Sequence, residues 1–147
     1  MAEHTLRPAG ETDSAAIKDL IHLVGINPTG LDWKRFIVAV TPERQIIGCG
    51  QLKPHGAGIL ELASIATLPD YRKQGIASAI INHLLSKSPR PLYLTCVSTM
   101  GPFYEQFGFY TLEQSEMPRY FQRLTKLAGL AFALSRQGKT LLVMKLK

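Results

Sequence analysis

Cysteine is scarce in this sequence, and no apolar run approaches the roughly 18 residues that a membrane-spanning helix needs. Cys49 and Cys96 lie within apolar, strand-like segments and lack the spacing of metal ligands. We therefore expect two buried, reduced thiols and neither a disulfide nor a metal site. Residues 1–10 also lack the apolar core of a secretory signal. These absences predict a cytoplasmic protein with no membrane partner.

The sequence also has few acidic residues: it contains 11 Asp and Glu but 17 Lys and Arg, which gives a formal net charge of +6. Such an excess can attract nucleic acid or an anionic cofactor. The basic residues are scattered, however, apart from a pair at 72–73 and an accumulation toward the C-terminus that a solvated helix face explains. We therefore expect no nucleic-acid partner. The 147 residues are enough for a sizeable core, so we predict a single domain over 1–147.

Apolar periodicity and turn residues predict alternating strands and helices. The first half is predicted to form strands at 6–9, 36–40, 46–52 and 59–68, with a helix at 13–24 and a helical turn at 31–35. The second half is predicted to form a helix at 76–87, strands at 91–97, 109–112 and 140–146, and a helical insertion at about 113–139. The early strands should be antiparallel, whereas the two strands joined by helix 76–87 must run parallel.

Neither of two common phosphate-binding motifs, Gly-x-x-x-x-Gly-Lys-Ser/Thr and Gly-x-Gly-x-x-Gly, occurs in the chain. Instead, a short basic turn containing Gly75 joins the long predicted strand to helix 76–87. The first N–H groups of such a helix have no partner within the helix, and its dipole adds partial positive charge beside Arg72 and Lys73. This turn is therefore predicted to bind a pyrophosphate.

Two motifs resemble those of a known family. The segment Arg72-Lys73-Gln74-Gly75-Ile76-Ala77 is similar to the coenzyme A signature of the GNAT superfamily of N-acetyltransferases, Gln/Arg-x-x-Gly-x-Gly/Ala. Downstream, Phe103-Tyr104-Glu105-Gln106-Phe107-Gly108-Phe109 resembles the family segment Phe-Tyr-Glu-x-x-Gly-Phe, and a predicted strand lies between the two. The resemblance implies an α/β (α+β) GNAT acyl-CoA N-acyltransferase fold. In that fold a mixed, mostly antiparallel sheet with flanking helices contains one splayed parallel strand pair.

The resemblance also implies an acetyl-CoA site and no metal. It assigns the pantetheine and acetyl contacts to the main chain of Ile65, Ala66 and Thr67, whose side chains can at the same time pack in the sheet core. Many family members have an asparagine seven residues before the motif tyrosine, where this chain has Val97, so we take the adjacent Ser98 as its substitute. The pyrophosphate contacts fall to the turn and the first helical residues: Arg72, Lys73, Gln74, Gly75, Ile76, Ala77 and Ser78.

Acetyl transfer to an amine requires a neutral nucleophile and a proton for the departing thiolate. Tyr104 matches the family tyrosine that acts as general acid. Glu61 matches the glutamate of the histone-acetyltransferase branch and is the candidate base, because desolvation in an apolar run raises the proton affinity of a carboxylate. Alternatively, Glu61 points outward or ties down a neighbouring loop, and ordered water deprotonates the amine. We expect His55, in a turn, and His83, on a polar helix face, at the surface.

The sequence therefore predicts an N-acetyltransferase that moves the acetyl group of acetyl-CoA to a primary amine by direct attack in a ternary complex. The alternative is a non-catalytic acyl-CoA binding or sensing module. The acceptor, a small-molecule or peptide amine, is not identified by the loops at 25–33 and 113–139. The insertion is interpreted as a lid over the acceptor site, a contact for a partner subunit or a plain structural helix. A homodimer is compatible with the family.

Overall fold

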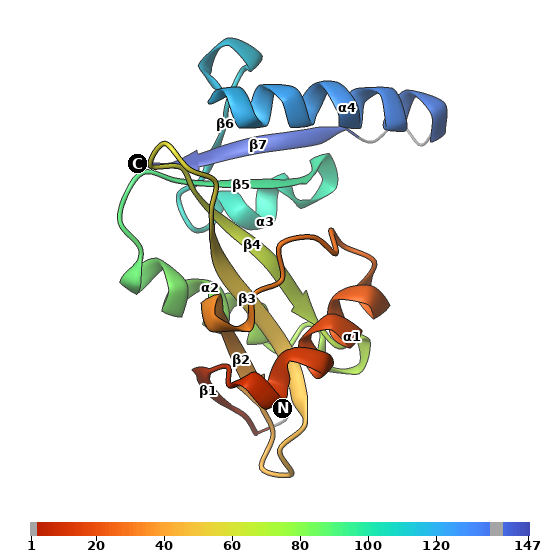
Figure 1. Ribbon diagram of the computed structural model, residues 1–147, viewed down its shortest axis with the longest axis vertical. Helices are drawn as coiled ribbons and strands as arrows, with labels where there is room; N and C mark the ends of the chain where they lie inside the picture. Colours follow the sequence, from red (N-terminus) through yellow and green to blue (C-terminus); the bar gives the residue numbers. More distant parts are fainter. Residues whose placement is uncertain (1–2, 136–139) are drawn as a thin grey trace. The chain divides into compact units, whose positions relative to one another are not determined.

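The computed structural model describes residues 3–135 and 140–147, so residues 136–139 of the predicted insertion lie outside the described residues. Strands and helices follow the predicted order (Figure 1). The strands are β1 (Thr5–Pro8), β2 (Phe36–Val40), β3 (Ile46–Pro54), β4 (Leu60–Thr67), β5 (Leu92–Val97), β6 (Tyr110–Thr111) and β7 (Leu141–Leu146). The α-helices are α1 (Ser14–Val24), α2 (Ile76–Lys87), α3 (Gly101–Glu105) and α4 (Arg119–Ser135). None of the described helices combines the length and the apolar character needed to cross a membrane.

The strands form one sheet in the order β1-β2-β3-β4-β5-β7-β6. The pairs β1–β2, β2–β3, β5–β7 and β6–β7 are antiparallel, and a short hairpin loop joins β3 to its neighbour β4. β4 and β5 are parallel, with Glu61 opposite Tyr93, because α2 connects them as a crossover. The predicted α/β fold with a mostly antiparallel sheet and one parallel pair is confirmed.

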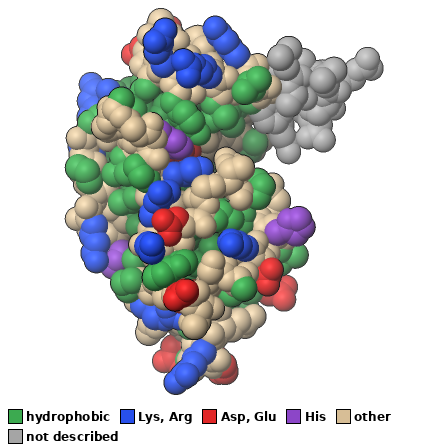
Figure 2. Space-filling model, in the orientation of Figure 1, with side chains coloured by type: hydrophobic (Ala, Val, Ile, Leu, Met, Phe, Trp, Pro, Cys, Tyr) green, Lys and Arg blue, Asp and Glu red, His purple; other side chains and the backbone are tan. Residues whose placement is uncertain are grey.

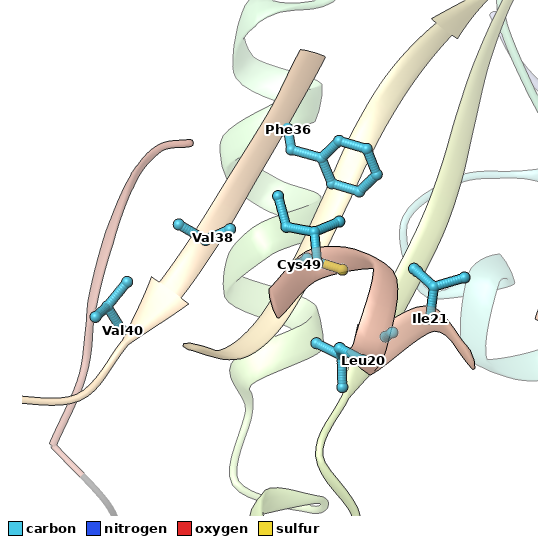
Figure 3. Packing of buried hydrophobic residues seen from close by; sticks show 8 residues of the cluster. Leu20, Ile21, Phe36, Val38, Val40 and Cys49 are labelled. Carbon is cyan, nitrogen blue, oxygen red and sulfur yellow. The ribbon is translucent and has the colours of Figure 1, made fainter. Parts of the chain in front are cut away.

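The chain divides into two compact units, Met1–Lys53 with Leu62–Ser88 and Pro54–Glu61 with Pro89–Lys147. In the first unit, the apolar face of α1 packs against β2 and β3, and Figure 3 shows these side chains pointing toward one another. Burial of this face is what stabilises a helix of such length in water. The buried cluster consists of Ile17, Leu20, Ile21, Phe36, Val38, Val40, Cys49 and Ala66.

Two glycines of β3 allow α2 to approach the sheet closely. A Cβ atom at Gly48 would lie 2.8 Å from Ile76, and one at Gly50 would lie 2.8 Å from Ile80. Both distances are too short for real side chains, so any larger residue at either place would push α2 outward. The first turn of α2 is thereby held against the sheet in the first unit, since Ile76 is buried.

In the second unit, α4 runs along β7 (Figure 1) and inserts Phe121 into a buried cluster with Tyr93, Leu112 and Val143. β6 and β7 still pair directly, with Tyr110 opposite Lys145. The long insertion therefore leaves the two final strands adjacent and antiparallel, although they are far apart in the sequence. α4 matches the helix that the apolar spacing predicts within 113–139.

Both cysteines are free thiols, as the sequence predicts, but only Cys49 is fully buried. Cys96 is half-buried at the end of β5. On the face drawn in Figure 2, Lys and Arg side chains are spread among apolar and acidic ones. The described cations of α4, Arg119, Arg123 and Lys126, are exposed.

We expect Phe121→Ala to lower the free energy of unfolding by about 3–5 kcal/mol, because it removes a fully buried aromatic ring and leaves a cavity. Leu127→Ala on the same helix is the matched control, since that side chain is 68% exposed, and should change the value by less than about 0.5 kcal/mol. Urea denaturation followed by circular dichroism measures both. Equal losses would contradict the packing of α4 described above.

Candidate functional site

The turn between β4 and α2 has the backbone that a helix-capping anion site needs. Gly75 is the N-cap of α2 with φ 81° and ψ 9°, a left-handed conformation that favours glycine. A Cβ atom there would meet no atom within 4 Å, so the space beside the turn is open and the positive φ alone favours glycine. Lys73 also has a positive φ, 63°, which is strained for a residue with a side chain. Arg72 and Lys73 are exposed.

The N–H groups at the start of α2 are available to a ligand. The N–H of Ala79 donates to the carbonyl oxygen of Gly75 at 3.0 Å and makes the first helical hydrogen bond. The N–H groups of Ile76, Ala77 and Ser78 precede it and have no helical carbonyl to donate to. Together with the helix dipole and the two neighbouring cations, they form a turn suited to a diphosphate. The side chain of Gln74 donates to the carbonyl of Asp70 at 3.5 Å.

The main chain of β4 bends immediately before Ile65. Ser64 has φ 59°, in the left-handed region, which interrupts the regular strand geometry. Its hydroxyl accepts a hydrogen bond from the buried Gln51 amide at 2.8 Å, and its carbonyl accepts one from the Cys49 thiol at 3.5 Å. Ala66 belongs to the buried cluster of the first unit, as the core interpretation of this segment predicts. A role for the main chain of Ile65, Ala66 and Thr67 in holding pantetheine stays a prediction.

Tyr104 lies on α3 in the second unit, half-buried, with its ring centroid 5.1 Å from that of Phe103 and 6.3 Å from that of Phe109. Burial, and to a lesser extent the neighbouring Cys96, raises the pKa of Tyr104 to about 12. A phenol with this pKa stays protonated at neutral pH. Tyr104 is therefore available as a proton donor and not as a base.

Glu61 is buried at the start of β4 and makes two contacts within the second unit. Its Oε1 lies 2.5 Å from Nε2 of His55, and its Oε2 accepts a long hydrogen bond, 3.4 Å, from the Thr95 hydroxyl. Glu61 therefore does not point outward. The contact with His55 ties down the loop between β3 and β4, which is one of the alternatives that the sequence leaves open.

The expectation that His55 is a surface residue is wrong. Its side chain is buried because Tyr120 of α4 stacks on the imidazole with ring centroids 4.0 Å apart and an interplanar angle of 22°. Phe121 meets the same ring edge-on at 6.1 Å. Burial, followed by the charge of Glu61, raises the pKa of Tyr120. His83 also departs from the surface expectation, since its Nε2 is buried.

Ser98, which follows β5, is hydrogen-bonded to Thr140, which precedes β7. Its N–H donates to the carbonyl of Thr140 at 2.8 Å, and its hydroxyl accepts from the Thr140 N–H at 3.3 Å. The structure thus gives Ser98 a structural contact, and its predicted cofactor contact is untested.

The predicted residues fall into two groups, one in each unit. The first unit brings the turn at 72–78 and the main chain of 65–67 together on consecutive elements. The second unit holds Tyr104, Ser98 and Glu61. Sequence reasoning did not connect Tyr120 with His55, because no periodicity or motif links positions so far apart in the chain.

Comparisons with known proteins identify the family and the fold. The family model described as Acetyltransferase (GNAT) domain matches residues 32–111. Among solved structures, the N-acetylglutamate synthase of Neisseria gonorrhoeae complexed with coenzyme A and N-acetyl-glutamate superposes with a TM-score of 0.73 at 18% identity. The match covers 100% of this chain and 36% of that one, so the chain spans about a third of its length.

Two further structures match over nearly their whole length. Rv2747 from Mycobacterium tuberculosis, solved in complex with CoA, gives a TM-score of 0.69 at 20% identity, with 95% of this chain and 97% of that chain covered. Escherichia coli ElaA gives 0.68 at 12% identity, with 100% of both chains covered. At these identities the likeness shows the fold. A search of curated protein sequences found no match.

The raised pKa of Tyr104 makes a prediction about alkaline stability. The unfolded phenol ionises near pH 10 and the folded one near 12, so the folded state holds its proton where the unfolded state has lost it. The free energy of unfolding should therefore fall by roughly 2–3 kcal/mol as pH rises from about 10 to about 12. Tyr104→Phe should remove this part of the pH dependence in urea titrations, and parallel curves for the two proteins would contradict the shift.

Proposed function

We propose that this chain, which belongs to the GNAT family of acetyltransferases, transfers the acetyl group of acetyl-CoA to a primary amine by direct attack in a ternary complex. The observation that carries the proposal is the turn at Gly75, where exposed cations and the unpartnered N–H groups of α2 converge on open space. Solved structures with the same fold contain coenzyme A, which supports this assignment.

The first unit would hold the cofactor. The N–H groups of 75–78, with Arg72 and Lys73, would bind the diphosphate of acetyl-CoA. Beyond the left-handed residue Ser64, the main chain of 65–67 would pair with the pantetheine amides. Ser98 remains the candidate for a contact from the end of β5.

Two residues of the second unit would handle protons. Acetyl-CoA supplies a thioester whose carbonyl carbon forms a bond to the amine nitrogen as the bond to sulfur breaks. Tyr104 would donate its proton to the departing sulfur, and its high pKa keeps that proton in place until the thiolate forms. Glu61 would accept the proton that the acceptor amine loses.

The acceptor is a small-molecule or peptide amine. L-Glutamate belongs in any test panel, because the matched Neisseria structure is an N-acetylglutamate synthase complexed with N-acetyl-glutamate. We further propose that the enzyme is cytoplasmic and works without a metal, a membrane or nucleic acid, as a monomer or a homodimer.

Acetyl-CoA should raise the melting temperature of the protein, since a ligand that binds only the folded state stabilises it. Gly75→Ala should reduce the affinity at least tenfold, because the strained turn would no longer present its N–H groups. Gly25→Ala is the matched control: it has the same φ of 81° and open surroundings but ends α1. Calorimetric titration with acetyl-CoA distinguishes them, and absence of binding to the wild type would refute the proposal.

Tyr104→Phe should lower kcat about 10²-fold or more while the Kd for acetyl-CoA changes less than about twofold, since the phenol acts on the leaving sulfur. Release of free thiol measures turnover with L-glutamate, spermidine, an aminoglycoside and a lysine peptide as acceptors. Equal turnover in the variant would remove Tyr104 from the mechanism. Binding of acetyl-CoA without transfer to any amine would support a non-catalytic module instead.

A further inference from the structure

His55 and Glu61 form a buried pair whose geometry goes beyond a simple loop contact. The two side chains are 8% and 9% exposed, and Nε2 of the imidazole lies 2.5 Å from Oε1 of the carboxylate. Burial of both groups is tolerated because they bond to each other. The short contact engages one carboxylate oxygen, while the other accepts only the 3.4 Å contact from Thr95. Oε2 is thus the oxygen with more capacity to accept a proton.

The imidazole cannot turn freely. Tyr120 covers its face and Phe121 its edge, and Phe121 is itself fully buried, so α4 fixes the ring plane. The hydroxyl of Tyr120 also lies in the field of the Glu61 charge. On the sheet side, Tyr93 of β5 is the register partner of Glu61 in the parallel strand pair. The ammonium of Lys145 on β7 lies 5.7 Å from the centroid of that tyrosine ring.

We propose that His55 is a positioning residue for the catalytic base Glu61. The imidazole donates its Nε2–H to Oε1, which holds the carboxylate in one orientation and leaves Oε2 to take the proton of the acceptor ammonium. The N–H bond of the ammonium breaks and the proton moves to Oε2. The electron pair left on nitrogen then forms the N–C bond as the C–S bond breaks, the departing sulfur takes the proton of Tyr104, and the new amide nitrogen returns its excess proton to the tyrosinate. This inference rests on the proposed function, and within it on the role of Glu61.

The two roles predict different effects on rate and on stability. A purely structural tie changes the rate only through the folding of the loop, whereas a positioning contact also decides how Oε2 meets the acceptor. Glutamine at this position can donate an N–H at a similar reach, so it should restore the orientation of the carboxylate.

The test compares wild type, His55→Gln, His55→Ala and Glu61→Gln, with His83→Gln as the control histidine. The rate with the fastest amine of the panel is measured at pH 8, together with the melting temperature of each protein. We expect His55→Ala to lower kcat about 10²-fold with the KM for acetyl-CoA unchanged, at a temperature well below its melting temperature. His55→Gln should keep most of the wild-type rate. His83→Gln should match the wild type.

Each contrary result has a distinct meaning. If both His55 variants lose rate only as they lose melting temperature, His55 is structural and the inference is wrong. If Glu61→Gln keeps full turnover, the base assignment fails while acetyl transfer stands. If the wild type transfers no acetyl group to any amine, the proposed function is wrong, and so is the inference that rests on it.

A readout that needs no acceptor is the tautomer of His55, observed by ¹⁵N correlation of the imidazole in the wild type and assigned with His55→Gln. We expect a proton on Nε2 at pH 8, since that nitrogen must donate to the carboxylate. A neutral imidazole protonated on Nδ1 alone would overturn the inference, because Glu61 would then carry the proton of the short contact.

Discussion

The left-handed backbone at Gly75 is the constraint on which the turn between β4 and α2 depends. It reverses the chain after the basic turn so that α2 starts at Ile76 with its first N–H groups directed away from the helix. Gly48 and Gly50 let that end of α2 pack closely on the sheet. A main-chain anion site, as proposed for this turn, would depend on conformation more than on side-chain identity, so a short motif can be enough to predict it.

Much of the fold could be predicted because apolar spacing reports burial. β2, with all five residues buried, and α2, with one buried face, have the predicted bounds. The bend at Ser64 escaped prediction, since no glycine marks the left-handed residue. The stacking of Tyr120 on His55 escaped it too, because local rules classify a histidine in a hairpin turn as exposed and carry no information on which distant helix will cover it.

The proposed function would divide between the two units. Anion recognition would fall to α2 and the end of β4, where main-chain N–H groups and the Arg72 and Lys73 charges lie on consecutive elements. Proton transfer would fall to α3 and the start of β4, where burial keeps the Tyr104 phenol protonated and the Glu61 carboxylate has specific partners. Strand β4 would contribute residues to both groups, on either side of its bend at Ser64.

Helix α4, which lies between β6 and β7, places the ring of Tyr120 on His55 of the β3–β4 loop. Without the rings of Tyr120 and Phe121, the imidazole of His55 would be more open to water, which would compete for its carboxylate partner. The burial of one residue in a hairpin loop therefore depends on a helix that follows much later in the chain.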